Sequence, residues 1–221
     1  MERTQPGVQH VSARELARLV QLFPTVAQVD VQAALACISL CQVSCLASAE
    51  ELLVPKLLSS ASCLLTWQSR QLPLPYRVYF QEPVPGAVQS LTPRQCQLLH
   101  CLYLRHHDGF VRQRHLEQLL ASAELEAFTT PFTFSLLGDY VQEILEVLAA
   151  HLTPVLLPSY VSLIEENPRY WSQTQGRVAS YWDIYYRTSR RGSPQFRYYV
   201  GNQLLKKLRA ALRENAPNQH S

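Results

Sequence analysis

Charged side chains are scarce in this sequence, because Asp, Glu, Lys and Arg make up only 17% of its 221 residues. An average globular chain carries roughly 25%. The hydrophobic fraction of 47% is nevertheless large enough for a substantial core. A low charge over many alanines, leucines and glutamines is typical of a surface that another molecule partly covers. We therefore expect this chain to bind a protein partner.

Motifs that mark common catalytic sites are also missing. The chain has only seven glycines, and it contains no Walker-type phosphate loop, no GxSxG and no HExxH motif. The neighbouring carboxylates Glu165 and Glu166 would point to different sides of a helix, so they do not form an acid–base pair. We expect a protein that is not an enzyme and uses no cofactor. An enzyme whose site is not visible in the sequence is the second alternative.

Paired metal ligands are lacking as well. The six cysteines form no CxxC pair, and all of them lie in apolar stretches that read as helical. Cys37, Cys41 and Cys45 would line one helix face, where free cysteines behave as small buried hydrophobes. Cys96 and Cys101 lie too far apart around a helix to share an ion, and structural zinc sites use short, paired spacings. No metal site is predicted, even with the nearby histidines His106, His107 and His115.

Unpaired cysteines favour an intracellular protein, either cytoplasmic or nuclear. The first residues, MERTQPGVQHVSARE, contain no apolar stretch of the kind found in a signal peptide. The longest charge-free run, residues 31–49, includes two glutamines and three serines, which would be costly in lipid. We expect a buried helix there and no transmembrane segment.

The sequence does contain a series of helix start signals. Residues 92–120 predict two helices joined by a polar corner, with Thr92 capping the first and Asp108 the second. Thr130-Pro131 and Asn167-Pro168 repeat the cap-then-proline signal at intervals of 38 and 37 residues. A single helical hairpin cannot bury its own apolar faces. We therefore predict an all-α chain of stacked helical hairpins, as a short α-solenoid or a helical bundle.

The amino half shows similar signals. Capping boxes at residues 12–15 and 48–51 predict helix starts, and Asp30 is expected to cap a helix between them. Pro55 would kink or split a helical segment that ends near Trp67. The following prolines interrupt this pattern and favour extended chain in a segment at 71–86. That segment could be a strand, a docking arm or an ordered loop, and we favour a loop lying along the helices.

These signals divide the chain into five parts. The predicted parts are a flexible N-terminus at 1–10, N-terminal helical hairpins at 11–70, a proline-rich connector at 71–91, C-terminal helical repeats with a basic end at 92–214, and a flexible tail at 215–221. Within the repeats, Thr130 is expected to start one long helix. Its predicted core line is Leu137, Tyr140, Val141, Ile144, Leu145 and Leu148. The other face would form an acidic partner-binding surface from Asp139, Glu143 and Glu146.

Charge is unevenly distributed along the chain. Residues 101–168 carry a net charge of −6, whereas residues 169–221 carry +8. One helical stripe of aromatic and apolar side chains is expected to pack in the core. It consists of Trp171, Val178, Trp182 and Tyr185. The basic side chains would form a partner-binding surface from Arg187, Arg190, Arg191, Arg197, Lys206, Lys207, Arg209 and Arg213. Simple solvation is the competing interpretation, and nucleic acid or anionic membrane is an alternative partner for residues 169–213.

The corner formed by Asp108, Val111 and Arg112 resembles the D-x-x-V-R corner of HEAT-type, armadillo-like helical repeats. The sequence departs from that pattern at His115, where the family has a small residue, and the 37-residue spacing is slightly short. The resemblance implies that the aspartate and arginine are structural and join neighbouring repeats. It also implies a scaffold. We expect a non-catalytic adaptor that forms one subunit of a larger intracellular complex, with nucleic-acid binding as the first alternative.

Overall fold

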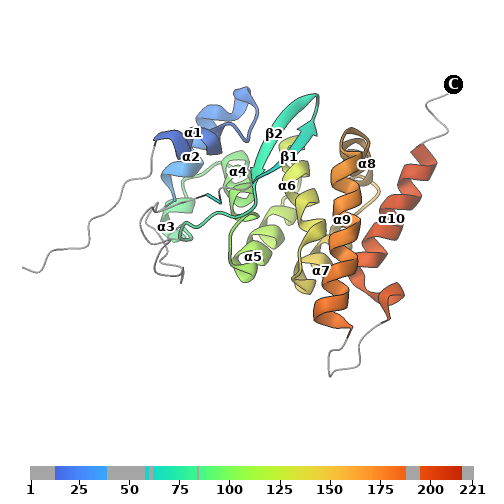
Figure 1. The fold of residues 1–221 in the computed structure, drawn as a ribbon. Helices are drawn as coiled ribbons and strands as arrows, with labels where there is room; N and C mark the ends of the chain where they lie inside the picture. Colours follow the sequence, from blue (N-terminus) through green and yellow to red (C-terminus); the bar gives the residue numbers. More distant parts are fainter. Residues whose placement is uncertain (1–12, 39–57, 60–61, 84, 188–194, 216–221) are drawn as a thin grey trace, which may run out of the picture.

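The computed structural model describes residues 13–38, 58–59, 62–83, 85–187 and 195–215. Most of these residues are helical, as predicted, and a two-stranded antiparallel sheet accompanies the helices. In Figure 1 the colours pass in chain order from the blue helix α1 at one end to the red helix α10 at the other. The helices are α1 (Ala13–Val20), α2 (Gln28–Ala36), α3 (Pro85–Val88), α4 (Pro93–Tyr103), α5 (Gly109–Leu120), α6 (Thr130–Ser135), α7 (Gln142–His151), α8 (Leu157–Glu166), α9 (Pro168–Tyr181) and α10 (Val200–Asn215). The strands are β1 (Ser62–Trp67) and β2 (Arg70–Pro75).

A continuous core runs through these elements. Helix α2 packs on α4, α4 on α5, α5 on α7, and α7 on α10. Helix α10 also contacts α8 and α9, and strand β1 contacts α8. Apolar residues at three- and four-residue spacing give a helix one buried stripe, as Leu204, Leu205 and Leu208 do in α10.

Two of the predicted caps are confirmed at the central helix pair. The Thr92 hydroxyl accepts a hydrogen bond from the Gln95 backbone N–H, and the Gln95 side chain accepts one from the Thr92 N–H. This reciprocal capping box starts α4. Asp108 accepts a hydrogen bond from the Phe110 N–H at 2.8 Å and caps α5.

The helix starts predicted at Thr130-Pro131 and Asn167-Pro168 are confirmed, but the side-chain caps expected there and at Asp30 are not formed. Thr130 is the first residue of α6, and Thr129 before it makes no side-chain cap bond. Asn167 precedes α9 but makes no cap bond either, since its side chain binds strand β1. Asp30 lies inside α2, and its carboxylate accepts a hydrogen bond from the Gln95 side chain at 2.9 Å.

Residues 62–75 form a β-hairpin, so the prediction of helical hairpins at 11–70, with a helical segment up to Trp67, is wrong here. Side chains alternate along β1, with Cys63 and Leu65 buried and their neighbours more exposed. Cys63 therefore lies in a strand and not in a helix as expected. A short apolar run of this kind fits a strand as well as a buried helix.

The turn of this hairpin lacks the residues that usually announce one. Gln68 and Ser69 both have a positive φ, at 50° and 61°, which is the geometry of a type I′ turn that normally carries Asn or Gly. Asn167 holds the hairpin to the helices. Its side-chain oxygen accepts from the Thr66 N–H at 2.7 Å, and its amide group donates to the Thr66 carbonyl at 2.6 Å and the Leu163 carbonyl at 2.8 Å.

The proline-rich segment 71–86 is extended over much of its length. Its first part belongs to β2, so the strand interpretation holds there and the preferred loop does not. Further along, Val78 pairs with Leu58 on one side and with the end of α4 on the other. Its N–H donates to the Arg105 carbonyl at 2.8 Å, and its carbonyl accepts from the His107 N–H at 3.0 Å.

The long helix predicted from Thr130 is broken into two. Helix α6 is followed by a 3-10 turn at Leu136–Gly138, and Asp139 is extended with φ −83° and ψ 153° before α7 begins. The predicted core line holds at Leu137, Ile144, Leu145 and Leu148, which are buried. It fails at Tyr140, whose surface is 39% exposed. The break turns Tyr140 outward and Asp139 inward.

Some predictions lie outside the described residues. These are the capping boxes at 12–15 and 48–51, the flexible N-terminus at 1–10, most of the tail, and Cys41, Cys45, Pro55, Arg190 and Arg191. Helix α10 extends to Asn215, the first residue of the predicted tail. In the described ranges no single helix is long and apolar enough to cross a membrane, whereas the bent pair Arg14–Val20 with Thr25–Ala36, at 112°, meets that criterion when taken together.

Candidate functional site

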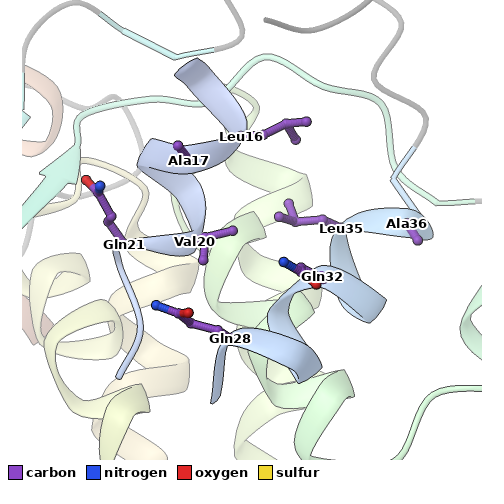
Figure 2. Close-up of a pocket in the computed structure, with 8 residues that line it drawn as sticks. All are labelled: Leu16, Ala17, Val20, Gln21, Gln28, Gln32, Leu35 and Ala36. Atoms are coloured by element: carbon purple, nitrogen blue, oxygen red, sulfur yellow. The ribbon is translucent and has the colours of Figure 1, made fainter. Parts of the chain in front are cut away.

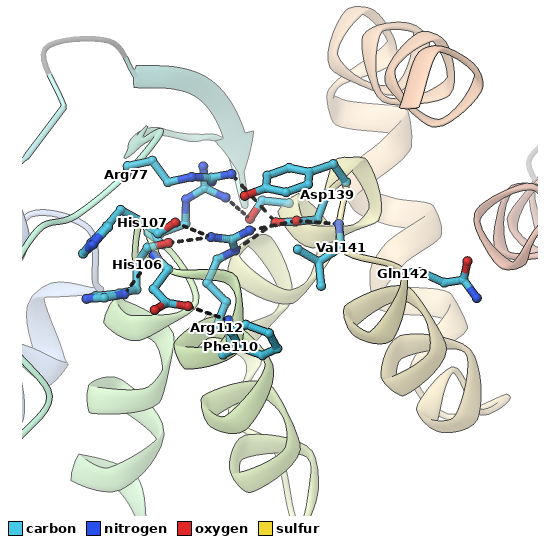
Figure 3. A network of polar contacts seen from close by, with 12 residues as sticks. Arg77, His106, His107, Phe110, Arg112, Asp139, Val141 and Gln142 are labelled. Carbon is cyan, nitrogen blue, oxygen red and sulfur yellow. Dashed lines mark hydrogen bonds and ion pairs between the residues drawn. The ribbon is translucent and has the colours of Figure 1, made fainter. Parts of the chain in front are cut away.

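A buried ion pair joins the α4–α5 corner to the break between α6 and α7 (Figure 3). Arg112 Nε and Nη2 donate to the two carboxylate oxygens of Asp139, each at 2.9 Å. The side chains are 0% and 3% exposed. Arg112 Nη1 also donates to the His106 carbonyl at 2.8 Å and the His107 carbonyl at 3.0 Å. Arg112 therefore binds two carbonyls of the corner between α4 and α5 and the carboxylate that precedes α7.

Asp139 is buried, so its assignment to an acidic partner-binding face is wrong. The other two members of that face, Glu143 and Glu146, are exposed on α7. Glu146 accepts a hydrogen bond from the Gln142 side chain at 2.7 Å. The repeat-like corner has two other residues. Asp108 caps α5, and Val111 packs in the buried stripe of this helix.

Two more arginines surround Asp139. Arg105 is buried, and its three nitrogens donate to the Pro75 carbonyl, the Ser135 hydroxyl and the Tyr76 carbonyl at 2.8–3.0 Å. Arg77 Nη2 lies 3.9 Å from an Asp139 oxygen, and its side chain is 27% exposed. Burial lowers the pKa of Arg77, and the neighbouring Arg112 charge lowers it further. The cluster therefore holds three guanidinium groups and one carboxylate.

Arg177 of α9 adds a fourth guanidinium at the edge of this cluster. Its Nη2 donates to the Tyr76 hydroxyl at 3.2 Å, and its guanidinium carbon lies 5.7 Å from the ring centres of both Tyr76 and Tyr170. A Cβ placed on Gly138, beside Asp139, would lie 3.3 Å from Arg177 Cδ. Within the described part of the chain, Arg177 forms no ion pair with a carboxylate.

Three tyrosine rings lie next to these arginines. The ring centres of Tyr140, Tyr181 and Tyr185 are 6.1, 5.9 and 6.0 Å apart in pairs. Tyr185 is 53% exposed and Tyr140 is 39% exposed. Tyr185 was expected in the core stripe, and this prediction is wrong. The guanidinium carbon of buried Arg112 lies 5.7 Å from the Tyr140 ring centre and so connects the rings to the ion pair.

A π-helix at Trp182–Tyr186 positions the rings at the end of α9. Such local insertions are rare and occur often at functional sites. The Tyr186 hydroxyl donates to the Tyr140 carbonyl at 2.7 Å and accepts from the Gln142 N–H at 3.1 Å. The π-helix is thus tied to the start of α7. We call the group of Tyr76, Arg77, Tyr140, Arg177, Tyr181 and Tyr185 the tyrosine–arginine surface.

The sequence analysis missed this surface. Its residues come from three stretches of chain, near positions 76, 140 and 180, and no short motif joins them. One local signal was available, because Gly138 followed by Asp139 is a helix stop and start signal. A helix end at this position would place Tyr140 outside the buried stripe that a continuous helix predicts.

The basic surface expected at the carboxyl end is described only in part. Arg187, Arg197, Lys206, Lys207, Arg209 and Arg213 are exposed, whereas Arg190 and Arg191 lie outside the described residues. Several of them contact the chain itself. Arg187 pairs with Asp183 at 2.6 Å, Arg209 Nε donates to the Gln175 side chain at 2.9 Å, and Lys207 donates to a backbone carbonyl. In the expected aromatic stripe, Trp171 and Val178 are buried.

A second candidate site is the groove between α1 and α2 (Figure 2). Its volume is about 560 Å³, and Leu16, Val20 and Leu35 point into the space between the helices. Alanines and the glutamines Gln21 and Gln28 complete much of its edge. The described residues of the lining include no charged side chain, so they offer apolar contact area but no group that selects a ligand by charge.

A pair of histidines joins α4 to α5. The Nδ1 atoms of His100 and His115 lie 2.9 Å apart, so one ring donates a hydrogen bond and the other accepts it. Burial lowers the pKa of His100 to about 4 and that of His115 to about 3. Both rings are therefore neutral at pH 7. The His115 ring stacks on Tyr103, with ring centres 4.2 Å apart.

Among the described residues, no group of three or more His, Cys, Asp or Glu side chains is placed to hold a metal ion. Comparison with protein-family models, curated proteins and solved structures found no match to the chain. What the tyrosine–arginine surface can bind therefore follows from its own chemical groups. It offers hydroxyls, aromatic edges and guanidinium donors on a base fixed by the Arg112–Asp139 pair.

Proposed function

We propose that this chain is a non-catalytic scaffold that binds a protein partner at the tyrosine–arginine surface. The observation that carries this proposal is the cluster of two exposed tyrosines, Tyr140 and Tyr185, with the half-buried Arg77 and Arg177 above the buried Arg112–Asp139 pair. Tyrosine and arginine are enriched among the residues that dominate protein–protein binding energies. Tyrosine buries a large ring area and loses few rotatable bonds when it binds.

The base of the surface supports this role because it limits the motion of the rings. Arg112 binds both Asp139 oxygens and two carbonyls, and the Tyr186 hydroxyl ties the π-helix to the backbone of Tyr140. Arg177 is held between the rings of Tyr76 and Tyr170. A surface that is ordered before binding loses less conformational entropy when a partner arrives.

Ring geometry favours protein over single-stranded nucleic acid as the partner. Bases stack on free aromatic faces. Here the planes of Tyr140, Tyr181 and Tyr185 meet at 74°, 38° and 44°, so each ring covers part of another. Trp171 of the same region is buried and offers no platform.

Affinity purification with quantitative mass spectrometry tests the proposal. We expect Tyr185→Ala to lose a specific protein that the wild-type chain recovers. Tyr198→Ala is the matched control, because Tyr198 is 57% exposed but does not belong to the tyrosine–arginine surface. Equal recovery of all partners by the wild-type chain and Tyr185→Ala would overturn the proposal, as would the absence of any specific partner of the wild-type chain.

A further inference from the structure

We infer that the tyrosine–arginine surface binds an acidic segment of its protein partner, with carboxylates of that segment pairing with Arg77 and Arg177. This inference rests on the proposed function and specifies the chemistry of the partner. Three observations carry it: the excess of positive charge at the surface, the open donors of two arginines, and the exposed carboxylates of α7.

Positive charge exceeds negative charge at this surface. Arg77, Arg105 and Arg112 surround the carboxylate of Asp139, and Arg177 lies beside the neighbouring Gly138. Asp139 already accepts three hydrogen bonds. One of its oxygens accepts from Arg112 Nη2 and the Val141 N–H, and the other accepts from Arg112 Nε. The remaining positive charge therefore lacks a counterion within the described residues.

The two outer arginines keep donors available. Arg177 uses Nη2 for the Tyr76 hydroxyl, and Arg77 uses Nη1 for the Tyr76 carbonyl. A guanidinium group carries five N–H donors in a planar fork that matches a carboxylate. Because both arginines are half-buried, their charges are less screened than those of fully exposed side chains. A carboxylate that reaches them would form charge-assisted hydrogen bonds.

The exposed carboxylates of α7 limit where an acidic segment of the partner can bind. Glu143 and Glu146 are exposed on this helix, and their charges act on the Tyr186 hydroxyl. A partner with negative charge along its whole length, such as a nucleic acid strand, would be repelled at this margin. A peptide can instead place its acidic residues over Arg77 and Arg177 and its apolar residues on Tyr140 and the other rings.

Fluorescence anisotropy with the full-length chain tests this inference. The probe is a fluorescein-labelled peptide in which glutamates alternate with leucines, and the comparison probe carries glutamine at every glutamate position. We expect the glutamate peptide to bind more tightly, with an affinity that falls as salt is added. Arg177→Gln should weaken its binding about tenfold, the effect of losing one charge-assisted hydrogen bond.

Arg169→Gln is the control variant, because Arg169 is exposed at the other end of α9 and should leave binding unchanged. Thermal melting of the variants shows whether each one folds, and the salt dependence of the wild-type chain tests the inference without any variant. Equal affinity for the two peptides, or equal effects of Arg177→Gln and Arg169→Gln, would overturn the inference. Tighter binding of a single-stranded RNA oligonucleotide that depends on Arg177 would overturn it in favour of nucleic acid.

The two proposals fail in different ways. If the peptides bind alike but Tyr185→Ala still loses its cellular partner, the acidic segment is excluded and the protein-binding surface stands. If Tyr185→Ala keeps every partner, the proposed function fails whatever the peptides do.

Discussion

Replacing Asp139 with asparagine should strongly destabilise the fold. The change keeps the size of the side chain and removes its negative charge. Arg112, which is 0% exposed, would then lose the carboxylate that accepts two of its hydrogen bonds. Arg105 and Arg77 would repel it without compensation.

The expected cost follows from the burial of this pair. Removing one partner of a buried ion pair typically costs about 3–5 kcal/mol, because the other charge stays buried and uncompensated. A typical domain is stable by only about 5–15 kcal/mol. We therefore expect Asp139→Asn to lose at least about a fifth of the free energy of unfolding.

A double-mutant cycle separates this effect from loss of shape. Arg112→Met leaves Asp139 with the Val141 N–H and with Arg77 at 3.9 Å, so we expect a cost of about 2–4 kcal/mol. The double variant should cost less than the sum of the two single variants by about 2 kcal/mol, because no charge of the pair remains.

Urea denaturation followed by far-UV circular dichroism measures these free energies. A loss below about 1 kcal/mol for Asp139→Asn, the size expected of an exposed ion pair, would refute the reasoning. Additive costs in the cycle would also refute it, because they would show that the two side chains are not coupled.

Three further predictions concern stability. The folded-state pKa values of His100 (about 4) and His115 (about 3) lie below the ordinary value of 6.5. On acidification the unfolded chain therefore binds protons before the folded chain does. The free energy of unfolding should be at its full value above about pH 6.5 and should fall below it by up to about 1.4 kcal/mol per histidine per pH unit. Denaturation across a pH series should show this slope, and His115→Gln should reduce it. Gly201→Ala should lower the melting temperature and cost about 1–3 kcal/mol of stability, because the added Cβ would lie 2.7 Å from Tyr199 Cε1. An unchanged melting temperature would contradict this prediction. Asn167→Ala should cost about 1–3 kcal/mol and speed amide hydrogen exchange in β1, because the two hydrogen bonds that tie Thr66 of this strand to Asn167 are lost, together with the bond to the Leu163 carbonyl. Unchanged exchange would count against this prediction.

The sequence predicts the central helix pair well because its signals are local. Thr92 and Asp108 lie within three residues of the N–H groups that they cap. Such contacts depend on the immediate neighbours and little on the rest of the fold. The mostly helical character follows in the same way from apolar periodicity and proline positions.

The β-hairpin could not be predicted from the same kind of signal. Its first strand is a short apolar run that also fits a buried helix, and its turn uses Gln68 and Ser69 in place of Asn and Gly. It is held by Asn167, about a hundred residues away. A contact at this separation leaves no trace in a local pattern.

The tyrosine–arginine surface escaped prediction for a similar reason. Arg77, Tyr140 and Tyr185 each look ordinary in their own stretch of sequence, and packing alone brings them together. The expected acidic face failed because helical periodicity was extended across Asp139, where the chain leaves the helix. The single acidic residue that turned inward became the counterion of Arg112.

Site-specific photo-crosslinking in cells tests the proposed surface most directly. A photoreactive phenylalanine analogue placed at Tyr185 should crosslink the chain to a partner protein, and the same analogue at Tyr198 should not. Crosslinks to that protein from position 198 but not from 185, or no protein crosslink from 185 at all, would contradict the assignment of the tyrosine–arginine surface as the binding site.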